Sequence, residues 1–220
     1  MKPGSEGLYV YALTETGLPR FFTVLGRRLQ NLPIDDVAAV IERGERPEFT
    51  TDAVRQQHDI VSRLTSRLAV VLPARFGSVT DEPSLRALVS RHRLEILGAF
   101  EQARGCAQMT IRVFGPDAAT HGESRPVART GTEFLERARE RSKQVPLEVA
   151  TVRAEMSAYV KAERIASGER SGLVTVFHLV PLERLDSYRR RASGLQSMLP
   201  RHGVTVTGPW PVFAFAPELF

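Results

Sequence analysis

The sequence predicts an α+β fold in two domains, and three observations lead to this prediction. The chain has 220 residues, enough for one large domain or two small ones. Hydrophobic residues make up 42% of it and charged residues 25%, the balance of a globular protein and not of a disordered chain. Strand-like and helix-like segments occur in groups and do not alternate regularly, which is typical of α+β folds.

The first half of the chain begins with strands. Residues 8–13 are apolar or aromatic throughout, as in a strand that is buried on both faces. Gly17 and Pro19 predict a turn, and residues 20–25 a second strand. Residues 34–42 fit a strand or a short helix by periodicity alone, and we favour a strand.

Two long helices complete the first half. The Thr-Asp pair at 51–52 supplies an N-cap, and an apolar stripe at spacings of three, four and seven predicts a helix over 52–70. Pro73 and Gly77 then break the helical pattern. A second helix is expected over 81–105, where the apolar stripe resumes.

A domain boundary is expected near residues 104–106, which gives an N-terminal α+β domain (1–105) and a C-terminal α+β domain (106–220). The strand–helix–strand order of the second domain suits a ferredoxin-like arrangement, with an inserted exposed loop near 115–130. Its expected elements are a strand over 109–114, a helix from Thr132, a helix over 146–167, a strand over 173–179, a helix over 181–198, and extended segments over 204–207 and 212–215.

Composition argues against several classes of protein. No window approaches the roughly 20 apolar residues that span a bilayer, so we expect no membrane span. The N-terminus lacks the apolar stretch of a secretory signal, and the single cysteine, Cys106, fits a reducing compartment; we therefore expect a cytoplasmic protein. The net charge is +5, but basic and acidic residues are interleaved at helical spacing, so a nucleic-acid partner is not favoured.

The sequence favours a protein that is not an enzyme and holds no cofactor or metal. Nucleophile elbows, phosphate loops, dinucleotide fingerprints and clustered metal ligands are all missing from it. His58 and His92 lie on or beside apolar helix stripes and could form an acid/base or metal site, although packed histidines are commoner there. A small enzyme with a His58/His92 site and a basic α+β RNA-binding module remain the alternatives.

The C-terminal segment from Gly208 is rich in aromatic residues and proline. Its prolines favour an extended path, with Phe213 and Phe215 on one side at strand spacing. We favour the interpretation that this segment packs back onto the core, and the alternative is an apolar contact for a partner. The candidate partner-binding residues are Arg75, Phe76, Trp210, Phe213 and Phe215.

Six segments together resemble the gas vesicle protein F/L family. The motifs Leu-Pro-Ala-Arg-Phe-Gly at 72–77 and Gly-Pro-Trp-Pro at 208–211 are specific in combination. The chain departs from the family pattern at Gln108 and Met109, and it lacks the hydroxyl groups that usually follow the second motif. The matching segments are Leu8–Tyr11, Asp36–Val40, the helix with His58, Leu72–Val79, Gly131–Leu135 and Thr207–Pro211.

The resemblance implies two α+β domains, the second a modified ferredoxin-like fold, and no catalytic residues. It also implies a minor component or assembly factor of gas vesicles, the hollow protein shells that give cells buoyancy. A shell that holds gas needs an apolar inner face, so its subunit (GvpA-type) exposes hydrophobic surface before it assembles. Our hypothesis is a chaperone-like factor, located at gas vesicles and in the cytoplasm, that binds this subunit and other gas vesicle accessory proteins and prevents aggregation during nucleation.

Overall fold

The structure, a computed structural model, divides into two compact units, which we call unit 1 and unit 2. Unit 1 comprises Met1–Gln108 together with Pro209–Phe220, and unit 2 comprises Met109–Gly208. The aromatic C-terminal segment, which the sequence places in the second domain, therefore groups with unit 1. The residues that the structure describes are 7–15, 17–44, 47–115, 147–167 and 173–219.

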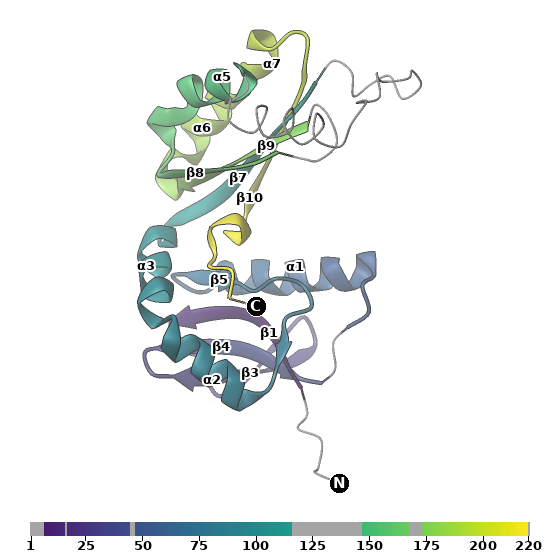
Figure 1. Ribbon diagram of the computed structural model, residues 1–220, viewed down its shortest axis with the longest axis vertical. Helices are drawn as coiled ribbons and strands as arrows, with labels where there is room; N and C mark the ends of the chain where they lie inside the picture. Colours follow the sequence, from purple (N-terminus) through teal and green to yellow (C-terminus); the bar gives the residue numbers. More distant parts are fainter. Residues whose placement is uncertain (1–6, 16, 45–46, 116–146, 168–172, 220) are drawn as a thin grey trace, which may run out of the picture. The chain divides into compact units, whose positions relative to one another are not determined.

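Unit 1 contains a six-stranded sheet in the order β2-β3-β4-β1-β5, with β6 also paired to β1 (Figure 1). All of these pairs are antiparallel. The strands expected over 8–13 and 20–25 are confirmed, and the first of them is buried on both faces. The strands are β1 (Leu8–Glu15), β2 (Phe21–Val24), β3 (Arg27–Ile34), β4 (Val37–Arg43), β5 (Val71–Pro73) and β6 (Val79–Thr80).

Residues 34–42 are mostly strand, as favoured, but the range also contains the turn between two strands. β3 ends at Ile34 and β4 begins at Val37. The turn between them places Asp35 at φ 57°, a left-handed conformation that aspartate adopts more readily than most residues. The sequence does not predict β3, because polar residues interrupt its apolar alternation.

Helix α1 (Thr51–Thr65) begins with a cap in which Thr50 Oγ1 accepts a hydrogen bond from the Ala53 amide at 3.2 Å. The predicted extension of this helix to residue 70 is wrong. Residues 66–69 instead form turns and bends, and residues 71–73 then form β5, whose pairing with β1 satisfies their backbone groups. The helix expected over 81–105 is two helices, α2 (Glu82–Arg91) and α3 (Arg93–Ala103), since His92 leaves the helical conformation at φ −99° and ψ 15°.

The helices of unit 1 cover both faces of its sheet (Figure 1). Ile60, Val61 and Leu64 of α1 pack in one core with Tyr9 and Tyr11 of β1. The residues that alternate with these tyrosines along β1 are buried as well. Helices α2 and α3 contact β3 and β5 but contribute nothing to the α1 core, so they cover the opposite face.

Unit 2 has a four-stranded sheet in the order β10-β7-β9-β8. Along the chain its elements run strand, helix, strand, strand, helix, strand, and the core lies between the sheet and the helices, where Tyr188, Ile111 and Met156 are fully buried. The elements are β7 (Cys106–Phe114), α5 (Leu147–Met156), β8 (Ala162–Ser167), β9 (Leu173–Pro181), α6 (Leu185–Ala192), α7 (Leu195–Met198) and β10 (Gly203–Trp210).

The strands expected over 109–114, 173–179 and 204–207 are confirmed. The helix expected over 146–167 is wrong in its second half, because residues 162–167 form β8 and pair with β9. The helix over 181–198 is split into short helical pieces. The predicted loop near 115–130 and the helix from Thr132 lie outside the described residues, apart from residue 115.

Candidate functional site

The C-terminal segment packs against α1 within unit 1. The imidazole of His58 stacks on the ring of Phe213 with centroids 5.8 Å apart and meets Trp210 edge to face at 5.3 Å. The Ala214 amide donates to Gln108 Oε1 at 2.7 Å. We call His58, Trp210 and Phe213 the tail cluster. Its contacts agree with the interpretation that this segment packs back onto the core.

The extended conformation predicted for residues 212–215 is wrong. Residues Phe213–Phe215 form a 3₁₀ turn, in which the Phe215 amide donates to the Val212 carbonyl at 2.9 Å. The turn places the two phenylalanines in different environments. Phe213 stacks on His58, whereas Phe215 is only 3% exposed. An extended segment would have placed both rings on one side.

The turn after β5 carries the other two candidate residues. Phe76 meets Phe49 at 5.6 Å between ring centroids and Tyr9 at 6.4 Å, both edge to face. Phe49 is 84% exposed, so this aromatic pair, Phe49 and Phe76, offers apolar surface to solvent. Arg75 forms an ion pair with Glu218 of the C-terminal segment. A surface ion pair thus links the turn after β5 to the C-terminal segment.

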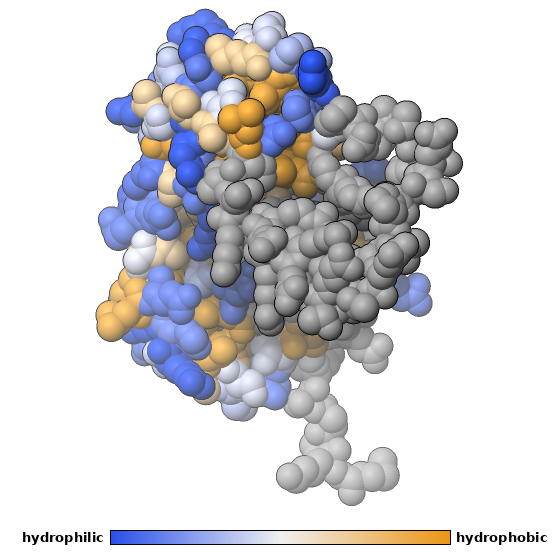
Figure 2. Space-filling model, turned by 45° about the horizontal axis from the view of Figure 1, so that its top comes forward, coloured by the Kyte–Doolittle hydropathy of each residue, from blue (hydrophilic) through white to orange (hydrophobic). Residues whose placement is uncertain are grey.

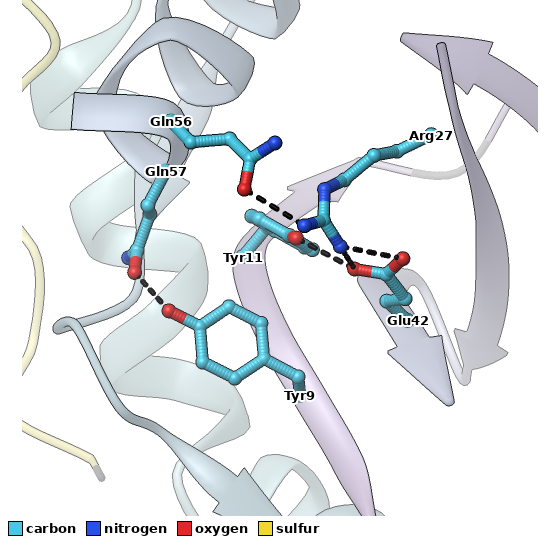
Figure 3. Close-up of polar contacts among 6 residues, drawn as sticks. All are labelled: Tyr9, Tyr11, Arg27, Glu42, Gln56 and Gln57. Atoms are coloured by element: carbon cyan, nitrogen blue, oxygen red, sulfur yellow. Dashed lines mark hydrogen bonds and ion pairs between the residues drawn. The ribbon is translucent and has the colours of Figure 1, made fainter. Parts of the chain in front are cut away.

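A polar cleft of about 250 Å³ lies between α1 and the sheet, and Figure 3 shows six of the residues that line it. Tyr9 donates its phenol hydrogen to Gln57, and Tyr11 donates to Glu42 at 2.7 Å. Arg27 donates to both carboxylate oxygens of Glu42, at 3.0 and 2.8 Å. Since Tyr9 also contacts Phe76, the cleft and the aromatic pair share one wall.

The charges of the cleft are largely satisfied internally. Burial, and then the neighbouring Glu42 carboxylate, raise the pKa of Tyr11 well above its usual range, so its phenol stays neutral and donates. The Arg27 guanidinium balances Glu42 and also donates to Gln56 at 2.8 Å. Its Nε is buried without a partner among the described residues. The arrangement fixes side chains and offers hydrogen bonds, which is typical of recognition and not of proton transfer.

His58 and His92 do not share a site. His58 lies on α1 in contact with Trp210 and Phe213, whereas His92 follows α2 on the opposite face of the sheet, with its Nδ1 2.9 Å from Glu95. Cys106 is half-buried at the start of β7. Within the described residues, the structure contains no group of three histidine, cysteine or acidic side chains that could bind a metal. No helix in these residues is both long and apolar enough to span a membrane.

Sequence reasoning missed the polar cleft. The available signals were two tyrosines at strand spacing in an otherwise aliphatic segment, and Gln57 within the buried stripe of α1. Gln57 is held from two sides, because its Nε2 also donates to the Ala74 carbonyl at 2.9 Å. Phe49 carried no pattern signal, since it stands alone before the helix.

The chain matches the family described as Gas vesicle synthesis protein GvpL/GvpF over residues 7–217. Among solved structures it is similar to the gas vesicle protein GvpF from Anabaena sp. PCC7120, with a TM-score of 0.71 and 13% identity, covering 97% of this chain and 99% of that one. It is equally similar to GvpF from Microcystis aeruginosa, with a TM-score of 0.72, 14% identity, and coverage of 96% and 99%. The curated proteins give no match.

Proposed function

The chain belongs to the GvpL/GvpF family of gas vesicle proteins, and from this premise we propose that it is an assembly factor that binds the hydrophobic shell subunit. In this proposal it keeps the subunit from aggregating while a vesicle nucleates. It acts by covering apolar surface, without catalysis and without a cofactor. It works in the cytoplasm and at the growing vesicle, together with other accessory proteins.

The observation that carries this proposal is the exposed aromatic pair on unit 1. Phe49 is largely exposed, although fully burying such a side chain is favourable by about 1.5–3 kcal/mol. Exposed aromatic groups of this kind are typical anchors of protein interfaces. Figure 2 shows that the hydrophobic side chains on one face of the molecule form separate patches among hydrophilic ones. An anchor of modest size suits a partner that is held and then released.

The surroundings of the aromatic pair fit a protein interface. The Arg75–Glu218 ion pair and the polar cleft lie next to it and would form a polar rim. Trp210 is partly exposed above His58 and supplies a second apolar contact. In this proposal Arg75, Phe76, Trp210 and Phe213 contact the shell subunit, and Phe215 holds the segment in place from within.

We also propose that unit 2 is a modified ferredoxin-like fold. Numbered within the unit, its strands have the spatial order 4-1-3-2, and its elements follow the β-α-β-β-α-β sequence of that fold. The short helix α7 and the helical turns are additions to it.

The proposal is tested by co-expressing the chain with the shell subunit and measuring how much subunit remains in the supernatant after centrifugation. The wild-type chain should retain the subunit there and co-purify with it. The Phe49→Ser variant should retain several-fold less, because the interface loses its anchor. Leu94→Ser is the matched control, since Leu94 is similarly exposed, at 80%, on the other face of unit 1.

Two outcomes would contradict the proposal. The first is a wild-type chain that neither binds the shell subunit nor keeps it in solution. The second is an equal loss in the Phe49 and Leu94 variants, which would show that retention does not depend on the aromatic pair.

A further inference from the structure

The two edges of the unit 1 sheet differ in how they are covered. At one edge, β5 lies beside the 3₁₀ turn of the C-terminal segment. At the other edge, β2 pairs only with β3, and within the described ranges no further strand adjoins it. Open edges of this kind can accept another strand, and proteins usually blunt them.

The register of the β2–β3 hairpin shows which backbone groups face this open edge. Phe22 lies opposite Leu29 and Val24 opposite Arg27, and the Asn31 amide donates to the Arg20 carbonyl at 2.9 Å. In an antiparallel ladder every second residue bonds to its neighbour. Residues 20, 22 and 24 therefore bond inward, and the N–H and C=O groups of Phe21 and Thr23 point outward.

The side chains at this edge are apolar and positively charged. Phe21 is 46% exposed, and the guanidinium carbons of Arg20 and Arg28 lie 5.5 and 4.9 Å from its ring centroid. At these distances each guanidinium group is attracted to the face of the ring, and this cation–π contact holds it there. In the part of the chain that the structure describes, neither arginine has a carboxylate partner.

We propose that the β2 edge binds an extended, acidic segment of another protein, which adds a strand beside Phe21 and Thr23. Backbone hydrogen bonds would supply affinity, and Arg20 and Arg28 would select acidic side chains. A second copy of this chain is disfavoured, because antiparallel pairing of two β2 strands would bring like charges together. This contact is separate from the one proposed for the shell subunit, which uses the aromatic pair.

The test uses a short fluorescent peptide of alternating glutamate and valine, with a control peptide that carries lysine in place of glutamate. Fluorescence anisotropy of the full chain should detect binding of the acidic peptide only, and added salt should weaken it. Amide exchange measured by NMR should slow at Phe21 and Thr23 when the acidic peptide is added. Exchange at Phe22 and Val24 should not change, because these amides already bond to β3.

Two variants separate the backbone and charge contributions. Thr23→Pro removes an outward N–H without removing a β2–β3 hydrogen bond, and it should abolish peptide binding. The double variant Arg20→Gln/Arg28→Gln should weaken binding about tenfold, whereas Arg91→Gln on α2 should leave it unchanged. Far-UV circular dichroism and the melting temperature verify that each variant is folded.

The proposal is overturned if the acidic peptide does not bind, if both peptides bind equally, or if Thr23→Pro has no effect. It is also overturned if the free chain forms a dimer that Thr23→Pro dissociates, because the edge would then be a self-interface. Retention of the shell subunit by the Thr23→Pro variant tests the two proposals separately, since the β2 proposal expects it to be normal.

Discussion

Tyr9 and Tyr11 in unit 1 and His178 in unit 2 are polar side chains that a strand directs towards a helix, yet their surroundings differ. The hydroxyl groups of the two tyrosines line a cleft, where they donate to Gln57 on α1 and Glu42 on β4. His178 is fully enclosed between β9 and α6, with Nδ1 2.8 Å from the Tyr188 hydroxyl. Polar groups that line a cleft are within reach of a ligand, whereas fully enclosed ones contribute to the stability of the core.

The enclosed pair has one consistent hydrogen-bond assignment. Nε2 of His178 lies 3.3 Å from Glu163, which Arg153 also binds at 2.6 Å. A carboxylate only accepts, so Nε2 carries the proton and Nδ1 accepts from Tyr188. Burial lowers the pKa of His178 although Glu163 opposes this, so the imidazole is neutral.

The largest expected effect is the loss of stability on Tyr188→Ala. This substitution removes a fully buried ring from the unit 2 core and leaves His178 without its donor. It should lower the free energy of unfolding by about 3–5 kcal/mol, measured by urea denaturation with circular dichroism. Tyr188→Phe keeps the ring and should cost only about 1–2 kcal/mol. Equal losses in the two variants would show that packing contributes nothing beyond the hydroxyl.

The second prediction concerns pH. The folded-state pKa of His178 lies below its unfolded value of 6.5, so the stabilising effect is complete above pH 6.5 and is lost as the pH falls through the folded value. The free energy of unfolding should drop by at most about 1.4 kcal/mol per pH unit in this range. His178→Gln should remove this slope, and the partly exposed control His92→Gln should retain it. A slope that persists in His178→Gln would assign the effect to other groups.

Tyr9→Phe in unit 1 should lower the free energy of unfolding by less, and it tests the contrast between the open cleft and the enclosed His178–Tyr188 pair. It removes the phenol that donates to Gln57 and accepts from the Gly77 amide at 3.4 Å. A cost of about 1 kcal/mol is expected, because the adjoining cleft lets water replace part of the lost bonding. The chain's single tryptophan, Trp210, belongs to unit 1, so its fluorescence can follow the unfolding. A cost as large as that of Tyr188→Ala would contradict the distinction between an open and an enclosed site.

The smallest effect is expected for Arg75→Ala. Arg75 and Glu218 are both largely exposed, so their ion pair should contribute at most about 0.5 kcal/mol to stability. If the pair instead borders the contact with the shell subunit, binding should weaken while the melting temperature stays constant. Isothermal titration with the subunit and thermal denaturation measure the two quantities. A large fall in the melting temperature would give Arg75 a structural role.

Sequence patterns predicted those elements whose local pattern agrees with their final packing. Residues 8–13 are buried on both faces, as their uninterrupted apolar run predicts. The patterns failed where distant pairing decided the outcome. Residues 162–167 join β9 although a helix was predicted there, and residues 71–73 join β1 although no strand was predicted. For the site, Phe76 and Trp210 were found through motifs. Glu42 and Arg27 were not found, because strand pairing brings them together: β1–β4 pairing places Glu42 at Tyr11, and β3–β4 pairing places Arg27 at Glu42.

Unit 1 is completed by a stretch of chain that follows all of unit 2 in the sequence. On the ribosome, His58 must therefore wait until residues 109–208 have been synthesised before Trp210 and Phe213 emerge to cover it. Until then the β5 side of the sheet lacks its last neighbour. Translation order thus delays the final closure of unit 1, and a nascent chain stalled before Pro209 would expose His58 and part of the α1 core that the finished protein conceals.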